Sequence, residues 1–226
     1  MKTLSYDIRE ITLEEVRSLC EKYHGYGTAG GASVLCFGVF EEERLVAAYS
    51  WQPPPPGAAR AVCPEAPQGV LALSRMVAVP REERKLNHVS KPLRRQMHTL
   101  IDRTRWPVLL TYSDEGQGHT GHVYKCAGWA ATSKTKRPFY LNEVGKRASS
   151  YSNGKHGTRL LTKGGDTTIQ RWEHWICPRG EALVWMESHG WKRMAIVGKV
   201  WRSGNQAYTY ARTEDLDSAE PKKVGF

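Results

Sequence analysis

The sequence predicts an α/β fold in which helices flank a central sheet that is partly antiparallel. Residues 11–23 and 85–104 carry the 3.6-residue hydrophobic repeat of amphipathic helices, and apolar strand-like segments stand between and after them. From residue 3 to residue 129, the predicted order is strand, helix, three strands, helix, strand, helix. An interleaved order of this kind is typical of layered α/β folds.

The N-terminal helix has a clear start and end in the sequence. Residues 3–9 alternate like a strand, and residues 11–23 then place their apolar side chains on one helical face. Thr12 is the expected N-cap, and Glu15, three residues later, completes a capping box. The glycine-rich stretch that begins at Gly25 predicts the end of this helix.

Three strands are predicted next. Residues 34–42 and 45–51 form the two arms of an expected hairpin. Residues 69–80 form a strand whose nearly continuous apolar content indicates a buried position. Residues 57–69, which are rich in Pro, Gly and Ala, are expected to be a loop between the second and third of these strands.

A second helix, a strand and a short third helix follow. Residues 85–104 form the helix, with Pro92 in its first turn. Residues 108–114 form a short apolar strand that ends in polar residues. Residues 119–129 predict a short helix that is closed at Gly128.

The C-terminal third of the chain carries weaker patterns. Residues 145–170 are rich in Gly, Ser, Thr and Lys and are expected to be an exposed loop or insertion. Residues 181–191 predict a short amphipathic segment, and residues 195–212 predict two strands around the turn Ser203-Gly204-Asn205. The charged tail after Glu214 is expected to fray.

The composition of the 226-residue chain argues against several classes of protein. A content of 40% hydrophobic and 25% charged residues does not fit a disordered tail, a fibrous protein or a membrane protein, and no run of 18 apolar residues is present. One domain is the default at this length, and two small ones are possible. The charged N-terminus lacks the apolar segment of a secretory signal. Five scattered cysteines without a CxxC pair favour a reduced, cytosolic protein.

The net charge of +10 is unevenly spread along the chain. Acidic residues are frequent in residues 1–60, whereas residues 81–212 carry an excess of Lys and Arg interleaved with Trp and Tyr. This distribution favours a partner that carries phosphates, such as nucleic acid, although a basic surface without a partner fits it as well. The candidate phosphate contacts are Lys134, Lys136, Arg137, Lys146, Arg147, Lys155, Arg159 and Lys163.

Two small groups of polar residues stand where reactive side chains are often found. His24 and Tyr26 belong to the loop after the first helix, where they form either a reactive loop or an ordinary helix end. Arg75 interrupts an apolar strand and therefore needs a partner, which is either a carboxylate in a salt bridge or a phosphate of a ligand.

A third group follows the strand that ends at residue 114. Asp114, His119 and Tyr124 lie on and after a glycine-flexed turn, at the strand end where ligands tend to bind in open α/β sheets. They can supply a base, a proton shuttle and a phenol, or they can simply cap the helix. The sequence contains no Walker loop, HExxH or GxSxG motif, which argues against a P-loop NTPase, a zincin and a serine hydrolase.

Taken in order, these residues resemble the Mom DNA-modification proteins of Mu-like bacteriophages. The resemblance rests on the loop with His24 and Tyr26, on LSRMVAVP with Asn87 and Ser90 beyond it, and on TYSDEGQGHTGHVYKCAGW. It covers about residues 5–130, and the last segment is its most specific part. Mom proteins are relatives of the GNAT acyltransferase fold, so the resemblance implies a GNAT-like mixed, largely antiparallel central sheet flanked by helices.

The resemblance implies a function and a division of the chain. Mom proteins convert adenine in double-stranded DNA to N6-carbamoylmethyladenine, which protects phage DNA from host restriction enzymes. The implied partner is duplex DNA, and the implied location is the host cytoplasm. Residues 1–130 are expected to be the GNAT-like catalytic core, and residues 131–226 a basic extension that completes the sheet and contacts DNA.

The resemblance also implies roles for single residues. The implied donor of the two-carbon unit is acetyl-CoA, and iron is the implied metal. A flipped adenine needs an aromatic pocket, for which Tyr26, Tyr49 and Trp51 are the candidates. The candidates for the reaction are His24, Tyr26, Asp114 and Tyr124, those for cofactor contact are Arg75, Ser90 and Ser113, and those for the metal are His24, Asp114 and His119.

One departure from the GNAT pattern argues against ordinary use of acetyl-CoA. GNAT enzymes hold the CoA diphosphate on a glycine-containing turn, whereas residues 84–90 read RKLNHVS and lack the glycine that lets backbone N–H groups approach phosphates. A modified pocket with Ser90 and basic side chains fits the sequence, and so does a different donor. Two other functions stay open, namely an ordinary GNAT N-acetyltransferase that acts on an amine and a DNA-binding protein without enzymatic activity.

Overall fold

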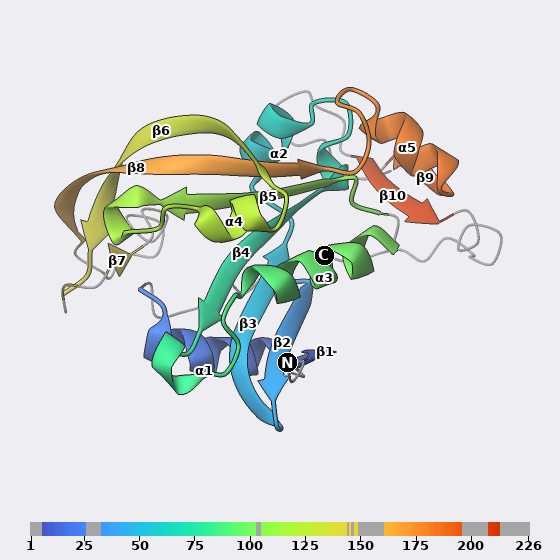
Figure 1. Cartoon of the computed structure of the whole chain (residues 1–226). Helices are drawn as coiled ribbons and strands as arrows, with labels where there is room; N and C mark the ends of the chain where they lie inside the picture. The colour runs from blue at the N-terminus through green and yellow to red at the C-terminus, as the bar shows by residue number, and fades with distance from the viewer. Residues whose placement is uncertain are drawn as a thin grey trace.

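The computed structural model describes residues 6–25, 33–102, 105–143, 145, 147–148, 161–195 and 208–212 (Figure 1). The strands are β1 (Asp7–Glu10), β2 (Leu35–Glu41), β3 (Arg44–Gln52), β4 (Val70–Ala78), β5 (Val108–Asp114), β6 (Ala130–Leu141), β7 (Arg147–Ala148), β8 (Thr162–Trp175), β9 (Trp191–Ala195) and β10 (Tyr208–Arg212). The helices are α1 (Leu13–Tyr23), α2 (Pro56–Val62), α3 (Ser90–Asp102), α4 (His122–Cys126) and α5 (Ala182–Ser188), and the 3-10 turns are η1 (Pro67–Gly69), η2 (Arg81–Glu83) and η3 (Glu115–Gln117).

One large sheet runs through the described part of the chain. Its strands lie in the order β1-β2-β3-β4-β5-β8-β6-β7, and neighbouring strands are antiparallel except β4 and β5, which run parallel. The prediction of a mixed, largely antiparallel sheet flanked by helices is therefore confirmed (Figure 1). β9 and β10 pair in a separate two-stranded sheet, and the turn predicted at 203–205 between them lies outside the described residues.

Local signals place the first elements as the sequence predicts. The Thr12 side chain accepts a hydrogen bond from the Glu15 backbone N–H at 3.3 Å, and the Glu15 carboxylate accepts one from the Thr12 N–H at 2.7 Å. β2 and β3 are joined at Glu42 and Glu43, which adopt positive φ angles of 50° and 69°. Positive φ at both central residues gives a tight hairpin turn whose twist matches that of its strands.

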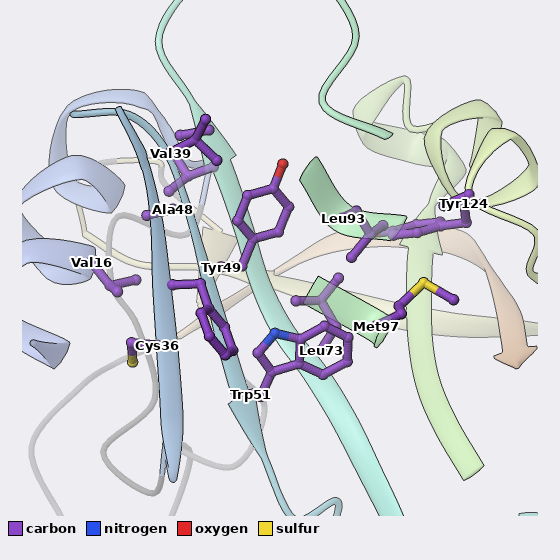
Figure 2. Packing of buried hydrophobic residues seen from close by; sticks show 14 of the residues in the cluster. Val16, Cys36, Val39, Ala48, Tyr49, Trp51, Leu73, Leu93, Met97 and Tyr124 are labelled. Atoms are coloured by element: carbon purple, nitrogen blue, oxygen red, sulfur yellow. The ribbon is translucent and has the colours of Figure 1, made fainter. Parts of the chain in front are cut away.

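The core lies on both sides of the sheet. Figure 2 shows Tyr49 and Trp51 of β3 on the side that faces Leu93 and Met97 of α3, whereas Val16 of α1 lies on the opposite side. All five side chains are buried. Since each buried large apolar side chain stabilises the fold by about 1.5–3 kcal/mol relative to exposure, α1 and α3 are fixed against opposite faces of β3.

The same packing removes Tyr49 and Trp51 from the list of candidate base-binding residues. Both are fully buried, with 0% of their surface exposed. The Tyr49 hydroxyl donates to the Val89 carbonyl at 2.8 Å, and Trp51 Nε1 donates to Gln96 Oε1 at 3.3 Å. The prediction that they line an adenine pocket is wrong, because neither ring can be reached without unpacking the core. Tyr26 lies outside the described residues.

A segment predicted as a loop contains a helix. Residues 56–62 form α2, because Pro56 at the first helical position fixes φ and loses no needed N–H, and the alanines that follow favour the helical state. Ala59 and Val62 then pack in a second apolar cluster with Met186 of α5 and the apolar residues of β4 and β5. Burial of Ala59 and Val62 therefore stabilises the helix, and the Pro/Gly/Ala composition of the segment does not predict this burial.

The segment 145–170, predicted as a loop, contains the beginning of β8. This strand starts at Thr162 and lies between β5 and β6, and β6 itself is absent from the sequence prediction. Gly164 obscures the strand pattern, yet the structure requires it, because a Cβ there would lie 2.2 Å from the Phe139 ring of β6. The glycine marks a close approach of two strands rather than a loop.

The remaining elements differ little from the predictions. α3 begins at Ser90, later than predicted, with Pro92 in its first turn. No helix within the described ranges is both long and apolar enough to cross a bilayer. β6 and β8 belong to the same sheet as β1–β5, and the division of the chain at residue 130 stays a prediction.

Candidate functional site

β4 and β5 separate after a short parallel pairing. Their ladder joins Val70 to Val108, Leu71 to Leu109 and Ala72 to Leu110, after which each strand continues without the other (Figure 1). The Thr111 hydroxyl donates to the Leu73 carbonyl at 3.0 Å at the point of separation. We call Leu73–Ala78 of β4 and Thr111–Asp114 of β5 the splayed region. In open α/β sheets ligands bind at such carboxyl-terminal strand ends.

A β-bulge lies at the start of the splayed region. Trp51 pairs with Leu73 but Ser50 pairs with Arg75, so Ser74 is the extra residue of β4. Bulges re-aim side chains and are frequent beside active sites. After this bulge, Arg75 lies on the same side of the sheet as α1, where its positive charge acts to lower the pKa values of Cys20 and His24.

His24 ends α1 beside the splayed region. Its backbone N–H donates to the Cys20 carbonyl at 2.9 Å, and its half-buried imidazole has its pKa lowered to about 4. Burial is the main cause, and the Arg75 guanidinium and the His119 imidazole add to it. The shift shows that His24, Arg75 and His119 lie close enough to interact, and it leaves His24 neutral at pH 7.

The loop after α1 touches the turn after β5. A Cβ at Gly25 would lie only 2.3 Å from Gln117 Oε1, so the two residues are in direct contact. Gln117 Nε2 in turn donates to Asp114 Oδ2 at 3.2 Å. The end of α1, with His24 and Gly25, therefore lies against the turn that follows β5.

Asp114 anchors this turn. Its carboxylate accepts hydrogen bonds from Gly116 N at 3.0 Å and Gln117 Nε2 at 3.2 Å, and further bonds from Thr167 Oγ1 and the Arg147 guanidinium. Both oxygens of this buried carboxylate are thus engaged by protein donors, one of them cationic, so neither is free to contact a substrate. We therefore expect Asp114 to position Gln117 rather than to act as the base of the sequence prediction.

Tyr124 and Ser113 lie on the other face of the sheet. Tyr124 is buried against Trp129 and Trp172, with ring centroids 6.0 and 5.9 Å away, and burial raises its pKa. The Ser113 hydroxyl accepts from Trp172 Nε1 at 2.9 Å. Because successive residues of a strand point to opposite faces, Ser113 and Asp114 cannot serve one surface. The predicted residues thus form two groups, one around His24 and one around Tyr124.

The sequence decides the family of the chain. The sequence model of the Mom protein family matches residues 5–176, well over half of the chain. The chain belongs to the Mom protein family. No curated protein matches it.

Three solved structures to which this Mom-family chain is similar are acetyltransferases by their descriptions. An IAA acetyltransferase from Bacillus cereus ATCC 14579 is 12% identical over 75% of this chain and 100% of that chain, with a TM-score of 0.45. The ribosomal-protein-S18-alanine N-acetyltransferase from Escherichia coli is 14% identical over 78% and 97%, with a TM-score of 0.45. A spermidine N-acetyltransferase from Vibrio cholerae, in complex with CoA and spermine, is 9% identical over 76% and 95%, with a TM-score of 0.47.

The described residues of the Mom-family chain do not form the predicted iron site. They contain no group of three His, Cys, Asp or Glu side chains placed to hold a metal ion. Of the predicted ligands His24, Asp114 and His119, the carboxylate of Asp114 is already engaged on both oxygens. Asp114 Oδ2 would have to break its hydrogen bonds with Arg147 and Gln117 to bind a metal ion. His24, Asp114 and His119 as they are placed therefore do not fit an iron ion.

Residues 84–90 stand where the turn that holds a CoA diphosphate is expected from the sequence, and their backbone makes other contacts. The Glu41 carboxylate accepts the backbone N–H groups of Lys85, at 2.9 Å, and Leu86. Arg84 folds back onto the carbonyls of Val79, at 3.0 Å, and Leu86. Two backbone donors of residues 84–90 are thus occupied by a carboxylate, whose charge opposes an anion. Residues 84–90 do not fit a CoA diphosphate in the usual mode.

Ser90 and Tyr112 complete the inventory of the site. Ser90 is the first residue of α3, is half-buried, and follows the altered turn. Tyr112 lies two residues before Asp114 on the same face of β5 and is 38% exposed. Partial burial raises its pKa, and the positive charges of Arg171 and Arg137 oppose that rise. Tyr112 is the exposed aromatic of the splayed region, although the sequence prediction did not single it out.

The predicted phosphate contacts on β6 and β8 are mostly paired with acids. Lys134 lies 2.6 Å from Glu115, and Lys136 and Lys163 lie 3.6 and 3.7 Å from Asp166. Arg147 is bound to Asp114, with its guanidinium 4.0 Å from the centroid of the Phe139 ring. Arg137 is exposed, whereas Lys146, Lys155 and Arg159 have side chains outside the description. Phosphate contact by this stretch stays a prediction.

The lowered pKa of His24 predicts an acid-sensitive contribution to stability. Unfolded His24 titrates near its usual value of 6.5, whereas the folded side chain titrates at about 4. As the pH falls through this window, the unfolded state binds more protons and the native state is destabilised. Between pH 7 and pH 5, the melting temperature of wild type should therefore fall more than that of His24→Asn, as differential scanning fluorimetry can measure. Equal falls would contradict the burial of the His24 side chain.

Proposed function

We propose that this Mom-family protein is a DNA-modifying transferase that converts adenine in double-stranded DNA to N6-carbamoylmethyladenine and so protects phage DNA from host restriction. Family membership and the basic composition support this function. The observation that carries it is the contact between Gly25 and Gln117, because it brings the end of α1, with His24, to the carboxyl-terminal end of β5.

The reaction replaces one N6 hydrogen of adenine by a CH2CONH2 group. A bond forms between N6 and the methylene carbon of a carbamoylmethyl donor, the leaving group on that carbon departs with the electrons of the bond that breaks, and N6 loses a proton. His24 is neutral at pH 7 and can accept that proton or a hydrogen bond from N6 as the amine becomes acidic. The Arg75 guanidinium beside it can hold an anionic or carbonyl group of the donor.

The adenine must leave the duplex stack before N6 can react. Extruding a base costs a few kcal/mol, and stacking on an aromatic side chain offsets about 1–3 kcal/mol of that cost. Tyr112 supplies a ring that is 38% exposed on the same face of β5 as Asp114. In this arrangement Asp114 and Gln117 position the loop that carries His24 and do not touch the reacting atoms.

Mass spectrometry of nucleosides tests the proposal. DNA from cells that express the protein should contain a deoxyadenosine with one CH2CONH2 group in place of a hydrogen, and DNA from cells with an empty vector should lack it. Unmodified nucleosides together with DNA binding by the purified protein would favour a binding protein without enzymatic activity. Acetylation of polyamines or peptides in place of DNA modification would favour an ordinary N-acetyltransferase.

A further inference from the structure

Exposed cations without an acidic partner among the described residues lie on α3 and α4. Lys91 and Arg94 on α3 and Lys125 on α4 are exposed, and no carboxylate in the described part of the chain lies within ion-pair distance of them. By contrast, Lys134 and Lys136 of β6 have the carboxylate partners Glu115 and Asp166. Positive charge that is not neutralised internally is available to an anionic partner.

Two of these cations, Arg94 and Lys125, border a pocket between α3, α4 and β8. The pocket has a volume of about 220 Å³, and its lining includes Arg94 and His98 of α3, Lys125 and Cys126 of α4, and His174 of β8. No carboxylate belongs to its lining, which also includes the apolar side chains of Met97 and Ile101 of α3. Arg and Lys beside apolar side chains suit a phosphodiester, whose charged oxygens and apolar sugar face need both kinds of surface.

The ring of His174 is fixed toward these charges. His174 Nδ1 donates to the Gly128 carbonyl at 3.1 Å, and the ring lies 6.1 Å from that of Trp129. Burial lowers the pKa of His174, and the nearby His98 and Arg94 act in the same direction. The pocket is thus lined by basic side chains and by no carboxylate, which suits an anionic partner.

We propose that the pocket between α3 and α4 is a phosphate-binding site that grips the DNA backbone outside the site of chemistry. The source of the phosphate, duplex DNA, rests on the proposed function, whereas the preference for a phosphate rests on the pocket alone. The pocket, rather than the basic residues of β6 and β8, then supplies phosphate contacts that fix the protein on the duplex.

Charge removal tests this assignment. Arg94→Ala/Lys125→Ala removes two exposed cations of the pocket, and Lys134→Ala/Lys136→Ala removes two paired cations of β6 as the matched control. Each neutralised phosphate contributes about 0.9 to the slope of log affinity against log salt, so the pocket variant should bind a short duplex more weakly with a slope reduced by about 1–2. An unchanged slope in the pocket variant, or the larger loss in the control variant, would overturn the assignment.

Cys126 offers a direct probe of the same pocket. It is exposed, with its Sγ 3.3 Å from His122 Nε2, whereas Cys20, Cys36, Cys63 and Cys177 are buried. A dianionic aromatic disulfide (dithiobisnitrobenzoate) should react with Cys126 faster than a neutral one (dithiodipyridine), relative to their rates with a free thiol. The preference should disappear in Arg94→Ala/Lys125→Ala, and its persistence there would contradict the site.

Protection of Cys126 distinguishes the two sources of phosphate. Duplex DNA should slow the reaction at concentrations where inorganic phosphate, at matched ionic strength, does not. Equal protection by inorganic phosphate would make the pocket a site for small anions and overturn the DNA assignment. Nucleoside analysis separates this result from the proposed function, because a wild-type protein that binds DNA through the pocket yet leaves adenine unchanged would refute the function and keep the site.

Discussion

Gly121→Ala should destabilise the protein far more than Gly118→Ala. Both glycines adopt left-handed backbone conformations, with φ of 72° and 73°, so each substitution carries a strain of about 1–2 kcal/mol. They differ in their surroundings. A Cβ at Gly121 would lie 2.1 Å from Cζ2 of Trp172, whereas a Cβ at Gly118 would meet nothing within 4 Å.

Trp172 cannot move aside to accept the added methyl group. Its ring is buried, packs against Tyr124, and donates through Nε1 to the Ser113 hydroxyl at 2.9 Å. Forcing a methyl group into such a site costs about 1–3 kcal/mol beyond the backbone strain. The total for Gly121→Ala is therefore about 2–5 kcal/mol, against about 1–2 kcal/mol for Gly118→Ala. Urea unfolding of the two variants beside wild type measures the difference, and equal losses would contradict the close packing of α4 on β8.

Asp114→Asn should have the second large effect. The substitution leaves the Arg147 guanidinium, with 12% of its side chain exposed, without its counter-charge. Removing one partner of a buried ion pair costs about 3–5 kcal/mol, because the remaining charge stays desolvated. We therefore expect a fall in melting temperature of roughly 10 °C.

The control for Asp114→Asn is Asp166→Asn. Asp166 also pairs with cations, but its side chain is 41% exposed and Lys136 is 75% exposed. Solvent-exposed ion pairs of this kind contribute about 0–1 kcal/mol, so the melting temperature should barely change. Restoration of stability in Asp114→Asn by the additional change Arg147→Met would assign the loss to the unpaired guanidinium. A similar loss in both single variants would contradict the role of Asp114 as the anchor.

Signals from residues close in sequence were sufficient to predict the elements of the first half of the sheet. The Thr12–Glu15 capping box, the hairpin of β2 and β3 and the apolar run of β5 each depend on residues close in sequence, and each is present as the sequence predicts. α2 escaped prediction because Pro56 reads as a strand breaker, although proline is favoured at the first position of a helix.

The surroundings of Asp114 could not be read from the sequence. Its partners Arg147 and Thr167 are 33 and 53 residues away, and they reach it only because β8 inserts between β5 and β6. A nonlocal strand order of this kind leaves no periodic signal along the chain. The sequence thus identifies Asp114 as a functional candidate but not as a carboxylate already saturated by four donors.

The contact between Gly25 and Gln117 gives the most direct test of the site. Gly25→Ala should push the flexible end of Gln117 away from Asp114 and displace His24, without a large loss of stability. Gly57→Ala is the matched control, because a Cβ there meets nothing within 4 Å. Adding Gly25→Ala to Gln117→Ala should cause little further loss, since the two changes break one contact.

The decisive measurement is the amount of modified deoxyadenosine in DNA from cells that express each variant, with melting temperatures recorded beside it. Wild type and Gly57→Ala should give the N6-carbamoylmethyl product in equal amounts, whereas Gly25→Ala should lose most of it while its melting temperature stays within a few degrees of wild type. Full modification by Gly25→Ala would contradict the view that the end of α1 and the turn after β5 together form the site of chemistry.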